Sequence, residues 1–316
     1  MIHTSPMSKN AIKYRIGDEL TIDQFYNYKI IDIKEGGMAV VLILERLTNA
    51  GFHDLLHRRI IAIKTFKPTS QIDHDIDFFK HELNMWINID SPNVVPLLKV
   101  ITLRNNLLAI MPYYEGNLRR IMERERVLDE FKCIRILRNV INGLSHSFKK
   151  YGIVHQDIKP ENILSDNRAY SDDNTYLVSD WGIANLQKCY YPKAPNMDAQ
   201  LMLFETLSRM GTLPYMSPER LLRHYTSIES DIFSLGIMFF EMLFGHPPLD
   251  FNSEKELPYQ IIEADYYYFA KEKLKDLSDN KIGKVILRCI NPEIKKRYDN
   301  YDKLRKDLNR ISKWIG

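Results

Sequence analysis

Short apolar runs separated by turn residues occupy the first third of the chain. Two of them, residues 28–33 and 39–44, flank a Gly-Gly pair, and further runs cover residues 60–63 and 107–111. Apolar runs of this length that end at Gly, Pro, Asn or Asp predict β-strands, and the first two predict a hairpin. The Pro- and Gly-containing stretch 112–117 then interrupts the pattern, which indicates a boundary between two parts of the chain.

Helical spacing of apolar residues is typical of the chain after residue 117. Residues 129–148 carry one apolar stripe, and Asp129 is placed to cap the first turn of this predicted helix. Another helix is predicted for residues 232–244, with Asp231 at its start. This stretch is shorter than the roughly 20 apolar residues that a membrane-spanning helix needs, so it predicts a buried core helix.

The composition narrows the class of protein. The chain has 316 residues, of which 45% are hydrophobic and 27% charged, as in a globular protein of one large domain or two lobes. A formal net charge of +3 gives no strong field that would favour nucleic acid or an anionic membrane. Cys133, Cys189 and Cys289 lack metal-ligand spacing and are expected to be reduced thiols. The chain begins without the apolar run of a secretory signal, so a cytoplasmic location is expected.

The polar stretch 155–162 concentrates groups that can do chemistry. The carboxylate of Asp157 can orient a hydroxyl group and accept its proton, and the ammonium of Lys159 can neutralise charge on a transferring phosphoryl group. The amide oxygen of Asn162, together with a carboxylate from elsewhere, can bind a divalent metal. The same residue types are common in turns, so this stretch alone is also compatible with a solvated loop.

Further candidate groups lie at or between the predicted strands. Lys64 ends an apolar strand, where an ammonium is costly unless it is paired, and Glu82 on a segment with helical spacing is its natural partner. Gly36 and Gly37 would let backbone N–H groups approach a phosphate. Asp180 follows a short predicted strand, where a carboxylate can meet a metal-bound phosphate. Each feature also has a simpler interpretation. Lys64 could be solvated at a strand end, the Gly-Gly pair could be part of a plain hairpin, and Asp180 could belong to a Ser-Asp turn.

The order of these motifs resembles that of the protein kinase family, in particular the serine/threonine kinases of eukaryotic type, which include bacterial members. The chain has, in order, a Gly-rich turn, Ile-Ala-Ile-Lys, a helical Glu, His-x-Asp-x-Lys-Pro-Glu-Asn, Asp-x-Gly, and Gly-Thr-x-x-Tyr before Ser-Pro-Glu. Each motif is weak or moderate alone, but chance does not account for the whole series. The resemblance implies an α+β, bilobal protein-kinase fold with a small β-rich N-lobe and a larger, mostly helical C-lobe.

The resemblance also implies where the parts of the chain begin and end. Residues 1–27 are expected to be an N-terminal extension, and residues 28–316 the kinase domain. Within that domain, the expected division is an N-lobe at residues 28–111, a hinge at 112–117 and a C-lobe at 118–316.

Roles of individual residues follow from the same resemblance. Asp157 is implied as the catalytic base, Lys159 as the cation beside the γ-phosphate, and Asn162 and Asp180 as ligands of Mg²⁺. The residues implied to bind ATP are Gly36, Gly37, Met38, Val41, Ala62, Lys64, Glu82, Met111, Pro112, Tyr113, Tyr114 and Leu164.

The activation segment, residues 180–219, indicates which kind of hydroxyl group the substrate would carry. In serine/threonine kinases the lysine at the place of Lys159 bonds a threonine of this segment, here Thr212. The implied partner is therefore a protein with a serine or threonine hydroxyl. Glu219 at the end of the segment is implied to form a buried ion pair with Arg297.

The chain departs from the family pattern in several places. Lys34 stands in the place of the first glycine of the phosphate loop, either close to phosphate or in solvent, and Ala39 stands in the place of the third. Trp181 replaces the usual Phe before Gly182, and its indole N–H needs a hydrogen-bond partner.

The activation segment is also long for the family. It could occlude the cleft, bind a regulatory partner or form a surface insertion. Thr206 and Ser208 are predicted sites of autophosphorylation. The aromatic run at residues 266–269 is compatible with a docking surface or with helix packing.

Three functions are compatible with these features. The first is an ATP- and Mg²⁺-dependent serine/threonine protein kinase. The second is a pseudokinase, a nucleotide-binding scaffold with an altered Gly loop, which the retained acid, lysine and amide residues argue against. The third is a small-molecule phosphotransferase, which leaves the stretch 212–219 without a role.

Gln156 generates a prediction about regulation, because it replaces the arginine that in the family clamps a phosphorylated activation segment. Activity is therefore expected to survive removal of phosphate from this segment. Kinase assays before and after phosphatase treatment measure this, and an activity abolished by the phosphatase contradicts the prediction.

Overall fold

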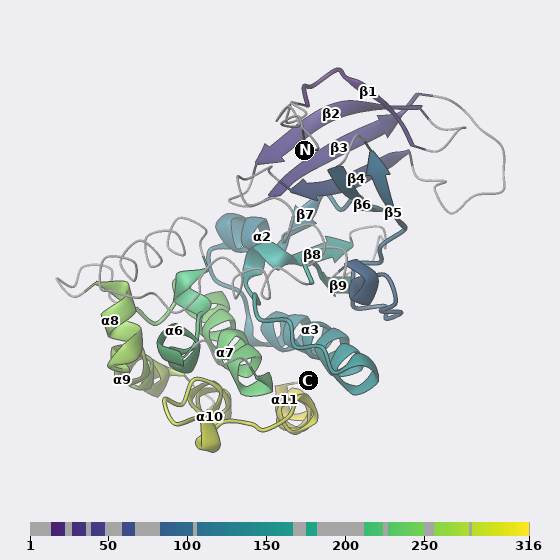
Figure 1. The fold of residues 1–316 in the computed structure, drawn as a ribbon. Helices are drawn as coiled ribbons and strands as arrows, with labels where there is room; N and C mark the ends of the chain where they lie inside the picture. The colour runs from purple at the N-terminus through teal and green to yellow at the C-terminus, as the bar shows by residue number, and fades with distance from the viewer. Residues whose placement is uncertain are drawn as a thin grey trace, which may run out of the picture. The chain divides into compact units, whose positions relative to one another are not determined.

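The structure, a computed structural model, describes residues 14–22, 27–35, 39–47, 59–66, 83–103, 106–166, 175–181, 212–223, 227–249, 256–277 and 280–315. The chain forms two units (Figure 1). The first comprises Met1–Asp77 and Leu97–Tyr113, and the second Phe78–Pro96 and Tyr114–Gly316. Residues 78–96 thus group with the helical unit.

The first unit is built on one antiparallel sheet with the strand order β1-β2-β3-β4-β6-β5 (Figure 1). Its strands are β1 (Glu19–Thr21), β2 (Asn27–Glu35), β3 (Ala39–Arg46), β4 (Ile60–Phe66), β5 (Lys99–Leu103) and β6 (Asn106–Pro112). Strands β2 and β3 pair antiparallel on either side of the Gly-Gly pair, as the hairpin prediction required. Strand β1 pairs with β2, so the sheet begins within the expected N-terminal extension.

The two faces of this sheet carry different residues. Leu42, Ile61, Ile63 and Ile110 belong to the hydrophobic core of the unit and have no exposed surface. Because side chains alternate along a strand, the neighbours of these residues lie on the other face. Register pairs Val41 with Lys64, and Ala62 with Met111. Four of the residues expected to bind ATP therefore share one face of the sheet.

The second unit combines a small sheet with most of the helices. Strands β7 (Gly116–Asn117), β8 (Ile163–Asp166) and β9 (Thr175–Val178) pair antiparallel in that order. The helices are α2 (Leu118–Glu125), α3 (Glu130–Tyr151), α6 (Pro218–Arg223), α7 (Ile228–Phe244), α8 (Leu257–Ile262), α9 (Asp265–Lys273), α10 (Asn280–Cys289) and α11 (Tyr301–Ile315). Short 3-10 turns are η1 (Pro160–Asn162), η2 (Leu213–Tyr215), η3 (Leu274–Asp276) and η4 (Ile294–Lys296).

Helix α3 follows the sequence prediction closely. The side chain of Asp129 accepts a hydrogen bond from the backbone N–H of Lys132, so it caps the helix as expected. Gly152 ends the helix in a left-handed conformation (φ 67°), which glycine adopts without the steric cost of a side chain.

Helix α7 is the buried core helix, but its start was wrongly predicted. It begins at Ile228, so Asp231 lies in its first turn instead of opening it. Every residue from 230 to 242 is buried, and the helix packs against α3 and α10. The carboxylate of Asp231 is therefore inside the unit, where it accepts hydrogen bonds from the loop between α3 and β8.

The strand-built first unit and the largely helical second unit confirm the α+β fold class. Cys133 and Cys289 are buried free thiols, and Cys189 lies outside the described residues. Of the aromatic run at residues 266–269, Tyr266 packs against Phe233 inside the helical unit while Tyr268 is exposed. Within the described ranges, no helix has both the length and the apolar character needed to cross a membrane.

A side chain at Gly236 on α7 is predicted to disturb the packing of this helix measurably. A Cβ atom at this position would lie 2.6 Å from the Cβ of Cys289 and 2.6 Å from the Cγ2 of Ile290. We expect Gly236→Ala to lower the free energy of unfolding by about 1–3 kcal/mol, despite alanine's helix propensity, because the α7–α10 contact must open. Urea denaturation measures the change.

Gly283→Ala is the matched control, because it also adds one methyl group to a helical glycine. The nearest atom to its Cβ would be the Cβ of Leu274 at 3.4 Å, an ordinary contact. We expect this variant to be as stable as wild type or up to about 1 kcal/mol more stable. Equal destabilisation of the two variants would show that the close contact is not the cause.

Candidate active site

The loop between α3 and β8 is held by a carboxylate that the sequence analysis did not recognise as part of the site. Asp231 is fully buried and accepts hydrogen bonds from the backbone N–H groups of His155 (2.8 Å) and Gln156 (2.7 Å). The hydroxyl of Tyr301 donates a third hydrogen bond to it (2.8 Å). Burial raises the pKa of Asp231, and these hydrogen bonds lower it in part. Core helix α7 thereby fixes the backbone of the loop.

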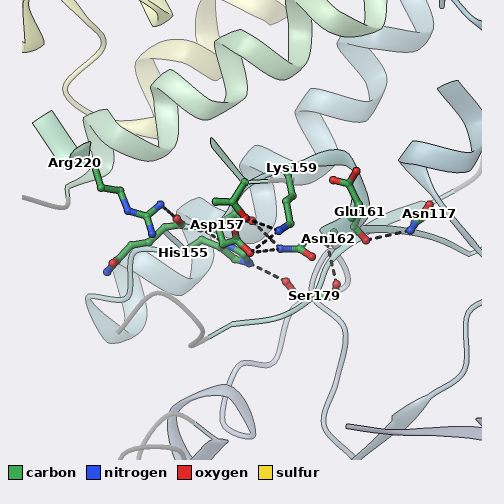
Figure 2. A network of polar contacts seen from close by, with 10 residues as sticks. Asn117, His155, Asp157, Lys159, Glu161, Asn162, Ser179 and Arg220 are labelled. Atoms are coloured by element: carbon green, nitrogen blue, oxygen red, sulfur yellow. Dashed lines mark hydrogen bonds and ion pairs between the residues drawn. The ribbon is translucent and has the colours of Figure 1, made fainter. Parts of the chain in front are cut away.

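His155 connects this loop to the end of strand β9. Its Nδ1 accepts the backbone N–H of Asp157 (3.2 Å), and its Nε2 lies 2.8 Å from the carbonyl oxygen of Ser179 (Figure 2). An accepting Nδ1 requires that Nε2 carry the proton, so the ring is the neutral Nε2–H tautomer. Trp181 packs edge-on against the ring at 4.8 Å, and its indole N–H donates to the carbonyl oxygen of Val178 (3.3 Å). The indole therefore has the partner that the sequence analysis required.

A buried polar cluster surrounds Asp157. The Nζ of Lys159 lies 3.3 Å from Oδ2 of Asp157 and donates a hydrogen bond to the hydroxyl of Thr212 (2.7 Å). That hydroxyl donates to Oδ1 of Asp157 (3.2 Å). Asn162 Nδ2 donates to the carbonyl oxygen (2.8 Å) and to Oδ2 (3.0 Å) of Asp157. All four residues are at most 7% exposed.

The charge state of Asp157 follows from these neighbours. Burial raises the pKa of Asp157, but the positive charges of Lys159 and Arg220 and the hydrogen bond from Asn162 outweigh it. The net pKa lies below the ordinary value of an aspartate, so the carboxylate is ionised at neutral pH. An ionised carboxylate can accept a hydrogen bond from a hydroxyl group and then its proton.

The donor set beside this cluster fits a divalent metal. In Figure 2 the NH₂ group of Asn162 points to Asp157, and its amide oxygen points away from that carboxylate. Ser179 donates hydrogen bonds to the carbonyl oxygen of Asn162 through its N–H (2.9 Å) and its hydroxyl (3.0 Å). Asp180, the next residue, has a left-handed backbone (φ 63°). Asn162 directly precedes β8 and Asp180 follows β9, its neighbour in the sheet, so an amide and a carboxylate lie at the ends of adjacent strands. Both groups supply oxygen ligands that Mg²⁺ accepts.

An ionic network connects the loop to helices α2 and α7. Arg119 contacts the carboxylates of Glu161 (2.6 Å) and Glu241 (2.7 Å), and it also donates to the hydroxyl of Tyr215. The Tyr215 hydroxyl in turn donates to Glu241. Sequence reasoning missed Arg119 and Glu241, since nothing in their local sequence marks them. Asn117, which caps α2, also donates to the carbonyl oxygen of Glu161 (3.3 Å).

Glu219 and Arg297 form a buried ion pair with two hydrogen bonds, of 2.9 and 3.0 Å. The hydroxyl of Ser230 donates to the same carboxylate (2.8 Å), and Arg297 lies over the ring of Phe233 at 4.9 Å. Burial raises the pKa of Glu219, but Arg297 and the further hydrogen bonds to this carboxylate together outweigh burial, so the pKa lies below its ordinary value. The end of the activation segment is therefore attached to the turn before α11.

The remaining expected site residues lie in several places. Val41, Ala62, Lys64, Met111, Pro112 and Tyr113 belong to the first unit, and Lys64 is 4% exposed in β4. Tyr114 and Leu164 belong to the second unit. The expected residues outside the described ranges are Gly36, Gly37, Met38, Glu82, Gly182, Thr206 and Ser208.

A strand-built unit, a helical unit and a buried loop with an acid, a lysine and an amide define the class of protein kinases. The chain matches the protein kinase domain family over residues 50–307 and belongs to it.

Comparison with curated proteins gives relatives of bacterial origin. The chain is 28% identical over 257 residues to a probable serine/threonine-protein kinase of Clostridium perfringens, covering 81% of this chain and 35% of the relative. It is 28% identical over 242 residues to a probable serine/threonine-protein kinase of Bifidobacterium longum (75% and 29%). It is 25% identical over 284 residues to the probable serine/threonine-protein kinase PknB of Lactococcus lactis (89% and 41%). The matched region spans less than half the length of each relative.

Removing one partner of the Glu219–Arg297 pair should destabilise the fold strongly. Arg297→Met leaves a buried carboxylate without its cation, and we expect a loss of about 3–5 kcal/mol in the free energy of unfolding. The double variant Glu219→Met/Arg297→Met removes both charges and should be more stable than Arg297→Met alone. Denaturant unfolding of the three proteins measures this, and a double variant no more stable than the single one contradicts the explanation.

Proposed function

We propose that this chain is a serine/threonine protein kinase that transfers the γ-phosphoryl group of Mg-ATP to a hydroxyl group of a protein. The observation that carries the proposal is the buried triangle of Asp157, Lys159 and Thr212. It joins the loop that bears the acid to the activation segment through one ammonium group. The names of the curated relatives, each a probable serine/threonine-protein kinase, support the choice of hydroxyl.

In this proposal Asp157 orients the substrate hydroxyl and accepts its proton. A carboxylate with a lowered pKa is a weak base, which suits a reaction in which the hydroxyl loses its proton late. Its contribution is therefore mostly positional: it holds the hydroxyl oxygen in line with the phosphorus atom. Lys159 lies beside the same carboxylate and supplies a positive charge for the oxygens of the transferring group.

Asn162 and Asp180 would hold Mg²⁺, which neutralises charge on the phosphate oxygens when it is bound. The hydrogen bonds from Ser179 to the carbonyl oxygen of Asn162 join the two backbone segments that carry these ligands. Nucleotide binding is assigned to the residues named from the family resemblance. Of these, Val41, Ala62, Lys64 and Met111 share one face of the sheet in the first unit.

The first test compares phosphoryl transfer by wild type and by Asp157→Asn, with labelled ATP, Mg²⁺ and a generic basic protein. The asparagine keeps the size of the side chain but removes its charge and its ability to accept a proton. We expect the rate of labelling on serine or threonine to fall by about 10²–10⁴-fold. Asp299→Asn is the matched control, because it makes the same change at an exposed surface ion pair with Lys303. Its rate should equal that of wild type.

The possible outcomes separate the proposed function from its competitors. Label on serine or threonine that depends on Asp157 supports the proposal. ATP that stabilises the fold without any transfer of label would favour a nucleotide-binding scaffold. Transfer to a small molecule but not to protein would favour the small-molecule phosphotransferase.

A further inference from the structure

Arg220 is a buried arginine that reaches from helix α6 to the loop between α3 and β8, which is the catalytic loop of the proposed kinase. It lies directly after Glu219 and is only 7% exposed. Its Nη1 donates a hydrogen bond to the backbone carbonyl oxygen of Gln156, next to Asp157 in the chain (Figure 2). Neither the family resemblance nor the proposed mechanism gives this side chain a role. Placing a guanidinium in the interior is costly, so the contact calls for an explanation.

The backbone of Gln156 has an unfavourable conformation that its neighbours must maintain. Its φ angle of 69° lies in the left-handed region, which carries a steric cost for a residue other than glycine. Asp231 accepts its N–H (2.7 Å), and Arg220 binds its carbonyl oxygen. The residue before the catalytic acid is thus held on both sides, by a carboxylate from α7 and a guanidinium from α6.

The positive charge of Arg220 is surrounded by the negative charges of three carboxylates. Burial lowers its pKa, and the carboxylates of Asp157, Asp231 and Glu219 raise it in part. An arginine stays protonated at neutral pH even so. The effect is reciprocal, because Arg220 is second to Lys159 among the cations that favour the ionised form of Asp157. Gln156 itself brings no charge, although the family motif has an arginine at its position.

We propose that Arg220 is a positioning residue for Asp157: it fixes the carbonyl oxygen of Gln156 and supplies the buried positive charge that the loop itself lacks at position 156. This inference rests on the proposed kinase function. A guanidinium that belongs to α6 needs no phosphate group to hold it beside the loop. The catalytic loop is therefore set by the fold itself, whatever the phosphorylation state of the activation segment.

The test uses Arg220→Gln, Arg220→Lys and the control Arg124→Met, whose side chain is 75% exposed on α2. Glutamine removes the charge and lysine keeps it without the planar fork. We expect kcat to fall about 10- to 100-fold in Arg220→Gln, with KM for ATP within about twofold of wild type. Arg220→Lys should have an intermediate kcat, and Arg124→Met that of wild type. Backbone hydrogen exchange of residues 153–164 should be faster in Arg220→Gln than in wild type, Arg220→Lys or Arg124→Met.

Wild-type kcat and wild-type exchange in Arg220→Gln would overturn the inference, as would a lysine variant no more active than the glutamine variant. Should Arg220→Gln fail to fold, Arg220→Lys decides: a reduced kcat with unchanged KM supports the inference, and a wild-type kcat overturns it. If wild type shows no transfer that depends on Asp157, the kinase proposal fails. The exchange comparison then decides the inference, since faster exchange in the variant supports it and unchanged exchange overturns it.

Discussion

The geometry of the loop between α3 and β8, which carries Asp157, depends on one carboxylate inside the helical core. Asp231 has no exposed surface, and a buried carboxylate is tolerated only where hydrogen bonds replace its hydration. Two of its donors are consecutive N–H groups of the loop and the third is Tyr301 on α11. The hydrogen bonds that satisfy the carboxylate also fix the backbone of the loop. The packing of α7 in the core therefore determines the position of Asp157, the next residue of the loop.

The other charges of the helical unit follow the same rule. Glu219 is paired with Arg297 and Glu241 with Arg119, both across a long separation in sequence, and Asp157 is paired with Lys159, two residues further along the same loop. Removing a single member of such a pair leaves an unpaired charge in a medium of low dielectric constant, which is costly. Each buried charge therefore fixes the position of its partner. A site made of ionised groups can be rigid in this setting without a large apolar contact area of its own.

Both described ends of the activation segment contact the catalytic loop. At the start, Trp181 packs against His155, whose ring also donates to Ser179. Near the end, Thr212 bonds both Lys159 and Asp157, and Arg220, directly after the segment, bonds the carbonyl oxygen of Gln156. Attachment at both ends makes the position of Asp157 a property of the folded helical unit.

The sequence by itself determined the fold class through the family resemblance, and it also determined strands β2, β3, β4 and β6, the extent of α3 and the main chemical motifs. Those features are local: apolar periodicity, turn residues and short strings such as the one from His155 to Asn162 are visible within a few residues. Family resemblance also paired Lys159 with Thr212 and Glu219 with Arg297.

Only the tertiary structure decided which of the other polar residues serve the site. Asp231 was interpreted as a helix start, because an acid before an apolar run is the usual signature of one. Arg119, Glu241 and Arg220 carry no local signal at all, since an arginine or a glutamate on a helix is ordinarily solvated. Their roles depend on burial and on partners up to 122 residues away along the chain, and neither is encoded in the neighbouring sequence.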